Sequence, residues 1–333
     1  LGTVLRALNR PDEALNAFDR TLQLAPAHAE AHNSRGVALM TLGRFADALP
    51  CFDQALALKP GFVEALNNRA AVLHNLGRFT DALPIYRQAL ALQPDNPQAQ
   101  YNVAVLQLAF GQYEEGWARY EARHRAYGTQ PPRGVTAPLW LGDAPIAGRR
   151  LLVYAEQGLG DTIQFCRYVP LLAQRGAKVV LAAQRPLLAL LRTLDGVAEL
   201  VADDGPLPPA DLRCPLLSLP RALRTTLATV PTQVPYLRSD PVQAQRWRER
   251  LGPSQALRVG LVWSGGFRKD DAGLWAVNER RNVPLARLAA LALPGVEFVS
   301  LQKGEDAERQ LRELQAAGWD GPRMADFTGE LAN

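Results

Sequence analysis

The sequence predicts an α-helical solenoid followed by two α/β domains with parallel sheets, the second of them incomplete. Three observations predict this architecture. A 34-residue repeat fills the first part of the chain, an apolar run from Leu151 leads through a glycine turn into an amphipathic segment, and a similar order begins again at Arg258. With 333 residues, the chain is long enough for two or three domains that each bury a core.

The repeat consists of residues that recur in register along the first 128 positions. The recurring positions are Pro26, Pro60 and Pro94; Gly43, Gly77 and Gly111; and Phe18, Phe52, Tyr86 and Tyr120. Each unit predicts a helical hairpin in which the glycine ends the first helix and the proline closes the second. The last unit departs from the pattern at Gly116, Arg123 and Gly128, as a terminal cap does.

Side-chain amides recur at the positions predicted to line the concave face of the solenoid. They are Asn33, Asn67, Asn68 and Asn102. A carboxamide can both donate to and accept from a peptide backbone, which gives affinity with little sequence preference. The solenoid is therefore predicted to bind a peptide or protein. The alternative is that asparagine only tolerates an exposed position on a helix.

Prolines and glycines mark the predicted domain boundaries. The solenoid covers residues 1–128, and residues 129–150 break every periodicity and predict a linker. Within it, Trp140 and Leu141 either attach the solenoid to the next domain or form a local hydrophobic plug.

The predicted α/β domains cover residues 151–240 and 241–333. Between them, Asp240 is expected to cap a helix that begins at Pro241. The second domain shows two strands, so we expect the natural protein to continue beyond Asn333.

The turn after the first predicted strand carries a candidate catalytic residue. Gly158 and Gly160 allow a sharp bend, and Asp161 places a carboxylate at the end of a parallel sheet where open α/β folds bind ligands. The third glycine of the dinucleotide fingerprint and the Gly-Lys-Ser/Thr of the phosphate loop are absent. The alternative is that Asp161 only caps the following helix.

A second candidate site lies in the last domain. It combines the turn at Ser264 and Gly265, the basic residue Arg281 ahead of a predicted helix, and Lys303 after the next strand. At the open end of a parallel sheet these residues predict a diphosphate-binding site. The alternative is that Arg281 and its neighbour Arg280 form a solvated helix start.

Composition excludes several classes of protein. Three widely spaced cysteines without a C-x-x-C or Cys/His group favour a reducing, cytoplasmic location and disfavour structural zinc, and no metal or other cofactor is expected. Basic residues are not clustered along one element, which disfavours nucleic-acid binding. No apolar run approaches the ~20 residues of a membrane span. All four histidines precede residue 128, so acid–base chemistry in the later domains requires carboxylates, and Ser264 or Ser300 has no histidine for hydrolase chemistry.

Four segments carry a family resemblance: EQGLGDTIQFCRYVPLL, RVGLVWSGG, ERRNVPLARLAAL and FVSLQKG. In this order after repeats that resemble tetratricopeptide repeats, they resemble bacterial repeat-linked glycosyltransferases of the GT-B fold, similar in layout to the heptosyltransferases. The resemblance implies two Rossmann-type domains and metal-independent transfer of a sugar from a nucleotide-sugar donor to a protein or glycan. It implies that Asp161 is the general base and that Arg281, where that family commonly has lysine, contacts the donor diphosphate.

The concave asparagines also resemble the asparagine ladder of the O-linked N-acetylglucosamine transferases. The competing hypothesis is a repeat-based interaction scaffold whose α/β half is inactive or incomplete.

Overall fold

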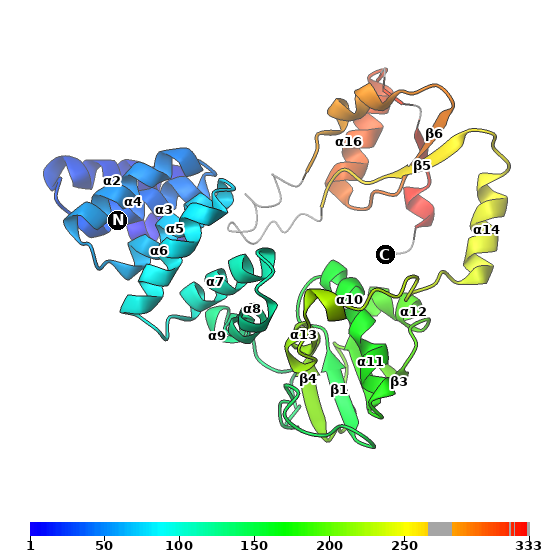
Figure 1. The fold of residues 1–333 in the computed structure, drawn as a ribbon. Coiled ribbons are helices and arrows are strands. Elements are labelled where there is room, and N and C mark those ends of the chain that lie inside the picture. The colour runs from blue at the N-terminus through cyan, green and yellow to red at the C-terminus, as the bar shows by residue number, and fades with distance from the viewer. Residues whose placement is uncertain (266–281, 320, 323, 332–333) are drawn as a thin grey trace. The chain divides into compact units, whose positions relative to one another are not determined.

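The computed structural model describes every residue except 266–281, 320, 323 and 332–333 (Figure 1). It divides into two compact units, residues 1–54 with 246–333 and residues 55–245. Helical hairpins form the first part of the chain, and two parallel sheets form the later part. Among the described residues, no helix combines the length and apolar character needed to span a bilayer.

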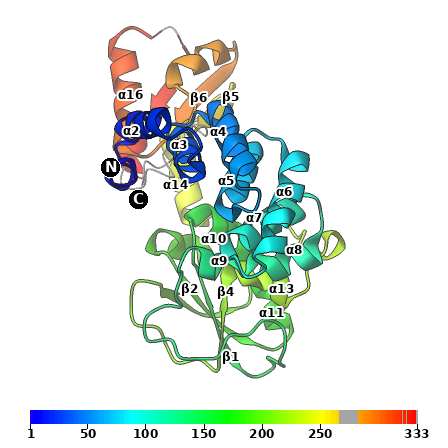
Figure 2. The same cartoon turned by 90° about the vertical axis from the view of Figure 1, so that its left-hand side faces the viewer.

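The repeats form the helical hairpins that their register predicts. Figures 1 and 2 both show α5 beside α6 and α7 beside α8. Gly43, Gly77 and Gly111 follow the first helices of successive hairpins with φ of +72°, +76° and +76°, a left-handed conformation that favours glycine. The helices are α1 (Gly2–Ala7), α2 (Pro11–Leu24), α3 (Ala29–Thr41), α4 (Phe45–Leu58), α5 (Val63–Asn75), α6 (Phe79–Leu92), α7 (Pro97–Ala109), α8 (Tyr113–Tyr120) and α9 (Arg123–Ala126).

Small side chains allow the paired helices to approach closely. A Cβ added at Gly36 would lie 2.6 Å from the ring of Phe52 on the second helix of its hairpin. At the equivalent position of the next two hairpins, Ala70 and Ala104 are fully buried. These three small residues thus leave room for the paired helices to pack closely.

The first sheet has four parallel strands in the order β3-β2-β1-β4. Apolar side chains are buried on both faces, which is typical of a parallel sheet covered on two sides. Leu151 and Val153 belong to the larger core, and Leu152 and Tyr154 belong to the smaller one on the opposite face. The strands are β1 (Arg150–Tyr154), β2 (Lys178–Ala183), β3 (Val197–Ala202) and β4 (Leu212–Pro215).

The helical segment after β1 is divided rather than continuous. It consists of α10 (Leu159–Phe165), the 3-10 turn η1 (Cys166–Tyr168) and α11 (Val169–Gln174). Pro170 lies in the first turn of α11, where the missing N–H costs no hydrogen bond. The helical segment is thus interrupted just before the proline. Shorter helical segments follow as η2 (Arg185–Leu187), α12 (Leu188–Leu191), η3 (Leu216–Ser218), α13 (Leu219–Ala222) and η4 (Leu227–Thr229).

Part of the segment predicted as a linker belongs to the first sheet domain. Trp140 is 2% exposed in the larger core, and its backbone N–H donates to the carbonyl of Arg213 at 2.8 Å. Leu139 forms a parallel bridge with Arg213, beside β4. Trp140 therefore anchors this segment to the sheet.

The last part of the chain holds a second parallel sheet with the order β5-β6-β7. It is preceded by α14 (Pro241–Leu251), whose amides at Val242 and Gln243 donate to the Asp240 carboxylate, as the predicted cap requires. The prediction of only two strands was wrong, because β7 adds a third that is too short to show a periodic pattern. The elements are β5 (Leu257–Leu261), η5 (Leu285–Leu291), β6 (Val296–Ser300), α16 (Glu305–Ala316), β7 (Met324–Asp326) and η6 (Thr328–Glu330).

Candidate functional site

The predicted asparagines lie on the first helices of their hairpins. Asn33 is on α3, Asn67 and Asn68 are on α5, and Asn102 is on α7. Asn67 is only 8% exposed, and its Oδ1 has no hydrogen-bond partner among the described residues. Asn102 Oδ1 accepts from Gln98 Nε2 at 3.1 Å. Asn67 is therefore not an exposed position that merely tolerates asparagine, and its buried acceptor is an unusual feature of the repeats.

The turn after β1 is shaped by Asp161. Gly158 is the N-cap of α10, and its N–H donates to Asp161 Oδ2 at 3.1 Å. The carboxylate thus supplies one half of a capping box, and glycine has no side chain to supply the other. Gly158 has φ of −70° and Gly160 is not left-handed, so neither needs the conformational freedom that the sequence analysis assigned to it. A Cβ at Gly160 would meet no atom within 4 Å. The tip of the turn is open, while the catalytic role of Asp161 stays a prediction.

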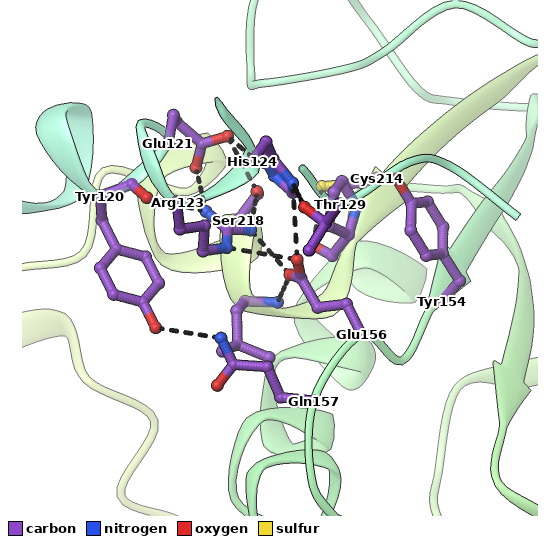
Figure 3. A network of polar contacts seen from close by, with 12 residues as sticks. Tyr120, Glu121, Arg123, His124, Thr129, Tyr154, Glu156, Gln157, Cys214 and Ser218 are labelled. Carbon is purple, nitrogen blue, oxygen red and sulfur yellow. Dashed lines mark hydrogen bonds and ion pairs between the residues drawn. The ribbon is translucent and has the colours of Figure 1, made fainter. Parts of the chain in front are cut away.

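A buried guanidinium lies at the base of this turn (Figure 3). Arg123 is 1% exposed, and its Nε and Nη2 donate to the two carboxylate oxygens of Glu156 at 3.2 and 2.7 Å. Nη2 also donates to Ser218 Oγ at 2.8 Å, and Nη1 donates to Glu121 Oε1 at 3.1 Å. One cation thus joins the last repeat to the carboxyl ends of β1 and β4.

The carboxylates around Arg123 have further partners. Leu217 N–H donates to Glu156 Oε1 at 3.3 Å, and Ser218 Oγ donates to Glu121 Oε2 at 3.0 Å. Cys214 is fully buried near both carboxylates, and burial raises the pKa of its thiol well above the ordinary value. The thiol is consequently a packed, unreactive side chain.

His124 faces the same carboxylates. Its Nδ1 lies 2.8 Å from Thr129 Oγ1 and 3.8 Å from Glu156, and its Nε2 lies 3.8 Å from Glu121. Burial, together with the charge of Arg123 and despite the opposing carboxylates, lowers the pKa of His124 below its ordinary value of 6.5. The imidazole is therefore neutral in the folded protein at neutral pH.

Acidification is expected to destabilise the unit that contains His124. Because the histidine binds a proton more readily in the unfolded chain, stability should fall as the pH drops below about 6.5 towards the lower folded pKa. Urea unfolding measured between pH 7.5 and 5.5 tests this. His124→Asn should lose that part of the pH dependence, and His74→Asn serves as a control on a helix of the same unit. Equal pH dependence in the wild type and His124→Asn would contradict the assignment.

The second predicted site is only partly described. Arg281 lies outside the described residues. The N–H of Ser264 donates to Gln302 Oε1 at 2.9 Å, and the N–H of Gly265 donates to Asn282 Oδ1 at 2.8 Å. Lys303 Nζ donates to the carbonyl of Thr328 at 2.9 Å. A phosphate at this turn would therefore have to replace existing partners, and the predicted diphosphate site stays a prediction.

Gln302 was not identified from the sequence. It is 2% exposed, its Oε1 accepts from the N–H groups of Trp263 and Ser264, and its Nε2 donates to the carbonyls of Ser264 and Lys303. The side chain holds the turns after β5 and β6 together. A glutamine two residues after an apolar strand gives no sequence signal for such a role.

Arg123 and Glu156 were likewise missed as a pair, although one signal was available. Arg123 occupies the repeat position of Ala55 and Ala89, which are fully buried. A cation at a position where the other repeats bury alanine requires a counter-charge. Arginine in place of alanine therefore indicates a buried ion pair. Among the described residues, no group of three or more side chains is arranged to hold a metal ion.

Comparison with known proteins assigns the helical hairpins. Residues 1–61, 38–97 and 73–122 match tetratricopeptide repeats. Protein FlbA of Caulobacter vibrioides is 30% identical over 255 residues, which cover 68% of this chain and 41% of FlbA. The chain thus spans about two-fifths of the length of that relative.

Two solved structures show weaker likeness over the repeats. MamA 41-end from Desulfovibrio magneticus RS-1 is 24% identical and covers 37% of this chain and 70% of its own, with a TM-score of 0.35. The first TPR of Spaghetti (RPAP3), bound to the HSP90 peptide SRMEEVD, is 24% identical and covers 33% of this chain and 86% of its own, with a TM-score of 0.32.

Proposed function

We propose that this chain is a protein-interaction module whose tetratricopeptide repeats dock an extended peptide segment of a partner protein. The observation that carries the proposal is the run of tetratricopeptide repeats with side-chain amides at recurring positions of its first helices. A side-chain amide can both donate to and accept from a peptide backbone. Repeats of this kind offer extended surfaces for partners.

Loss of the amide row is expected to weaken peptide binding. The probe is a peptide selected on the wild-type protein from a random library displayed on phage, and its affinity is measured by calorimetry. Replacing Asn67, Asn68 and Asn102 with alanine should reduce affinity at least about tenfold, since each lost hydrogen bond is worth roughly 0.5–1.5 kcal/mol. Gln88→Ala removes an exposed amide from a second helix and is the matched control. Unchanged affinity in the triple variant, or no selectable peptide, would contradict the proposal.

A second candidate function is transfer of a sugar from a nucleotide-sugar donor to the docked protein or to a glycan. It is favoured by the position of Asp161 in an open turn at the carboxyl end of β1, together with the motifs that resemble GT-B glycosyltransferases. Asp161 would accept the proton of the acceptor hydroxyl. The donor diphosphate would be bound by Ser264, Gly265, Arg281 and Lys303, and Gly158 and Gly160 would leave room for the acceptor. The transfer rate with and without the Asp161 carboxylate tests this candidate.

A further inference from the structure

The guanidinium of Arg123 uses all of its hydrogen-bonding capacity. An arginine carries five N–H donors, and this one makes five contacts, to both oxygens of Glu156, to Glu121, to Ser218 and to the carbonyl of Tyr120. The partners Glu156 and Ser218 are 33 and 95 residues away along the chain. Arg123 thus fixes three separate segments relative to one another.

The turn after β1 depends on these contacts at its base. Glu156 lies two residues after the end of β1 and is held by Arg123 and by the N–H of Leu217. Beyond it, the carbonyl of Gln157 accepts from Gln184 Nε2 at 2.8 Å. Gly160 at the tip has open space around it. The turn is therefore positioned from its base, by Arg123 of the last repeat together with Leu217 and Gln184.

Aromatic contacts connect the same base to the first helix of the last complete repeat. The Arg123 guanidinium lies 4.8 Å from the ring centroid of Tyr120, and Tyr120 lies 5.6 Å from the ring of Tyr101. Tyr101 precedes Asn102 on α7, at the repeat position of Asn67. The hydroxyl of Tyr120 also accepts from Gln157 Nε2 at 3.5 Å. Packed side chains therefore run without interruption from the proposed docking helix to the turn.

We propose that Arg123 is a positioning residue that holds the turn of residues 156–161 to the last repeat, so that a peptide docked on the repeats also restricts this turn. The second half of this inference rests on the proposed docking function. The first half concerns the chain alone. A peptide that contacts Tyr101 would restrict the motion of Tyr120 and Arg123, and through them that of Glu156.

Amide hydrogen exchange on the whole protein tests the positioning role. Arg123→Lys keeps the charge, but a compact ammonium cannot reach all three segments. The variant is expected to speed exchange at the Gly158 and Thr162 amides about tenfold or more, while the amides of β2 change less than about twofold. Arg125→Lys, an exposed arginine on the same helix, is the matched control. A second variant, Glu156→Gln, keeps the shape of the side chain while weakening the pair and should give the same pattern.

Three results would overturn the positioning role. The first is an equal increase in amide exchange rate in the turn and in β2, which indicates a purely global effect. The second is an unchanged exchange rate in the turn of both Arg123→Lys and Glu156→Gln. The third is faster exchange in the turn of Arg125→Lys. With the phage-selected peptide bound, the wild-type turn should exchange more slowly, and Arg123→Lys should lose that slowing. If the peptide binds and amide exchange in the turn is unchanged, the proposed coupling between docking and the turn is wrong. If no peptide binds, the docking function fails, while the comparison of the unliganded variants still decides the role of Arg123.

Discussion

Replacing Arg123 with methionine is expected to lower the free energy of unfolding of the 55–245 unit by about 3–5 kcal/mol. The change leaves the carboxylates of Glu156 and Glu121 without their cation, and a buried charge that loses its partner is strongly destabilising. Their side chains are only 8% and 14% exposed, so water compensates little. Urea unfolding followed by circular dichroism measures the loss.

Two further variants separate the effect of the lost ion pair on the free energy of unfolding from the effect of lost packing. Arg125→Met removes an exposed arginine whose guanidinium bonds only to Gln100 among the described residues, and should change stability by no more than about 0.5 kcal/mol. The double variant Arg123→Met with Glu156→Gln should lose less than the two single variants added together, because they share one interaction. A loss below about 1 kcal/mol in Arg123→Met would show that the buried pair contributes little.

Asp161→Asn is expected to lower the rate of sugar transfer by about 10² to 10⁴, if the second candidate function holds. The amide cannot take up the acceptor proton, and loss of a general base has an effect of this size. Stability should stay nearly unchanged, because the carboxamide oxygen can still accept the Gly158 N–H that now bonds to Oδ2. Transfer and melting are measured on the same preparation of the full-length protein.

The control for this variant is Asp195→Asn, which removes an exposed carboxylate from the same sheet domain. It should retain the parental rate. A stable Asp161→Asn protein with parental turnover would leave Asp161 as a helix cap alone. A large fall in melting temperature would instead show that the cap contributes more than the retained hydrogen bond implies, against the expectation above.

The helical hairpins of the repeats were predictable from the sequence. Their signals are local, since a left-handed glycine such as Gly77 and a small residue such as Ala70 act within one hairpin. Recurrence in register adds evidence that one segment alone lacks. The strand at Leu151, which is β1 in the structure, was also predictable, because a strand buried on both faces is a continuous apolar run.

The pairing of polar side chains that lie far apart in sequence could not be predicted, because it depends on how the chain folds. In the sequence, Arg123 is only an irregular residue of the repeat. In the structure, Glu156 and Ser218 are its hydrogen-bond partners. In the same way, the sequence predicts an open anion site at the turn of Ser264, but in the structure the Ser264 N–H already donates to Gln302 Oε1. Sequence patterns report which residues share a helix or strand, whereas hydrogen bonds and ion pairs depend on distances that packing alone sets. The helices and strands were therefore predictable from the sequence, and the partners of their polar groups were not.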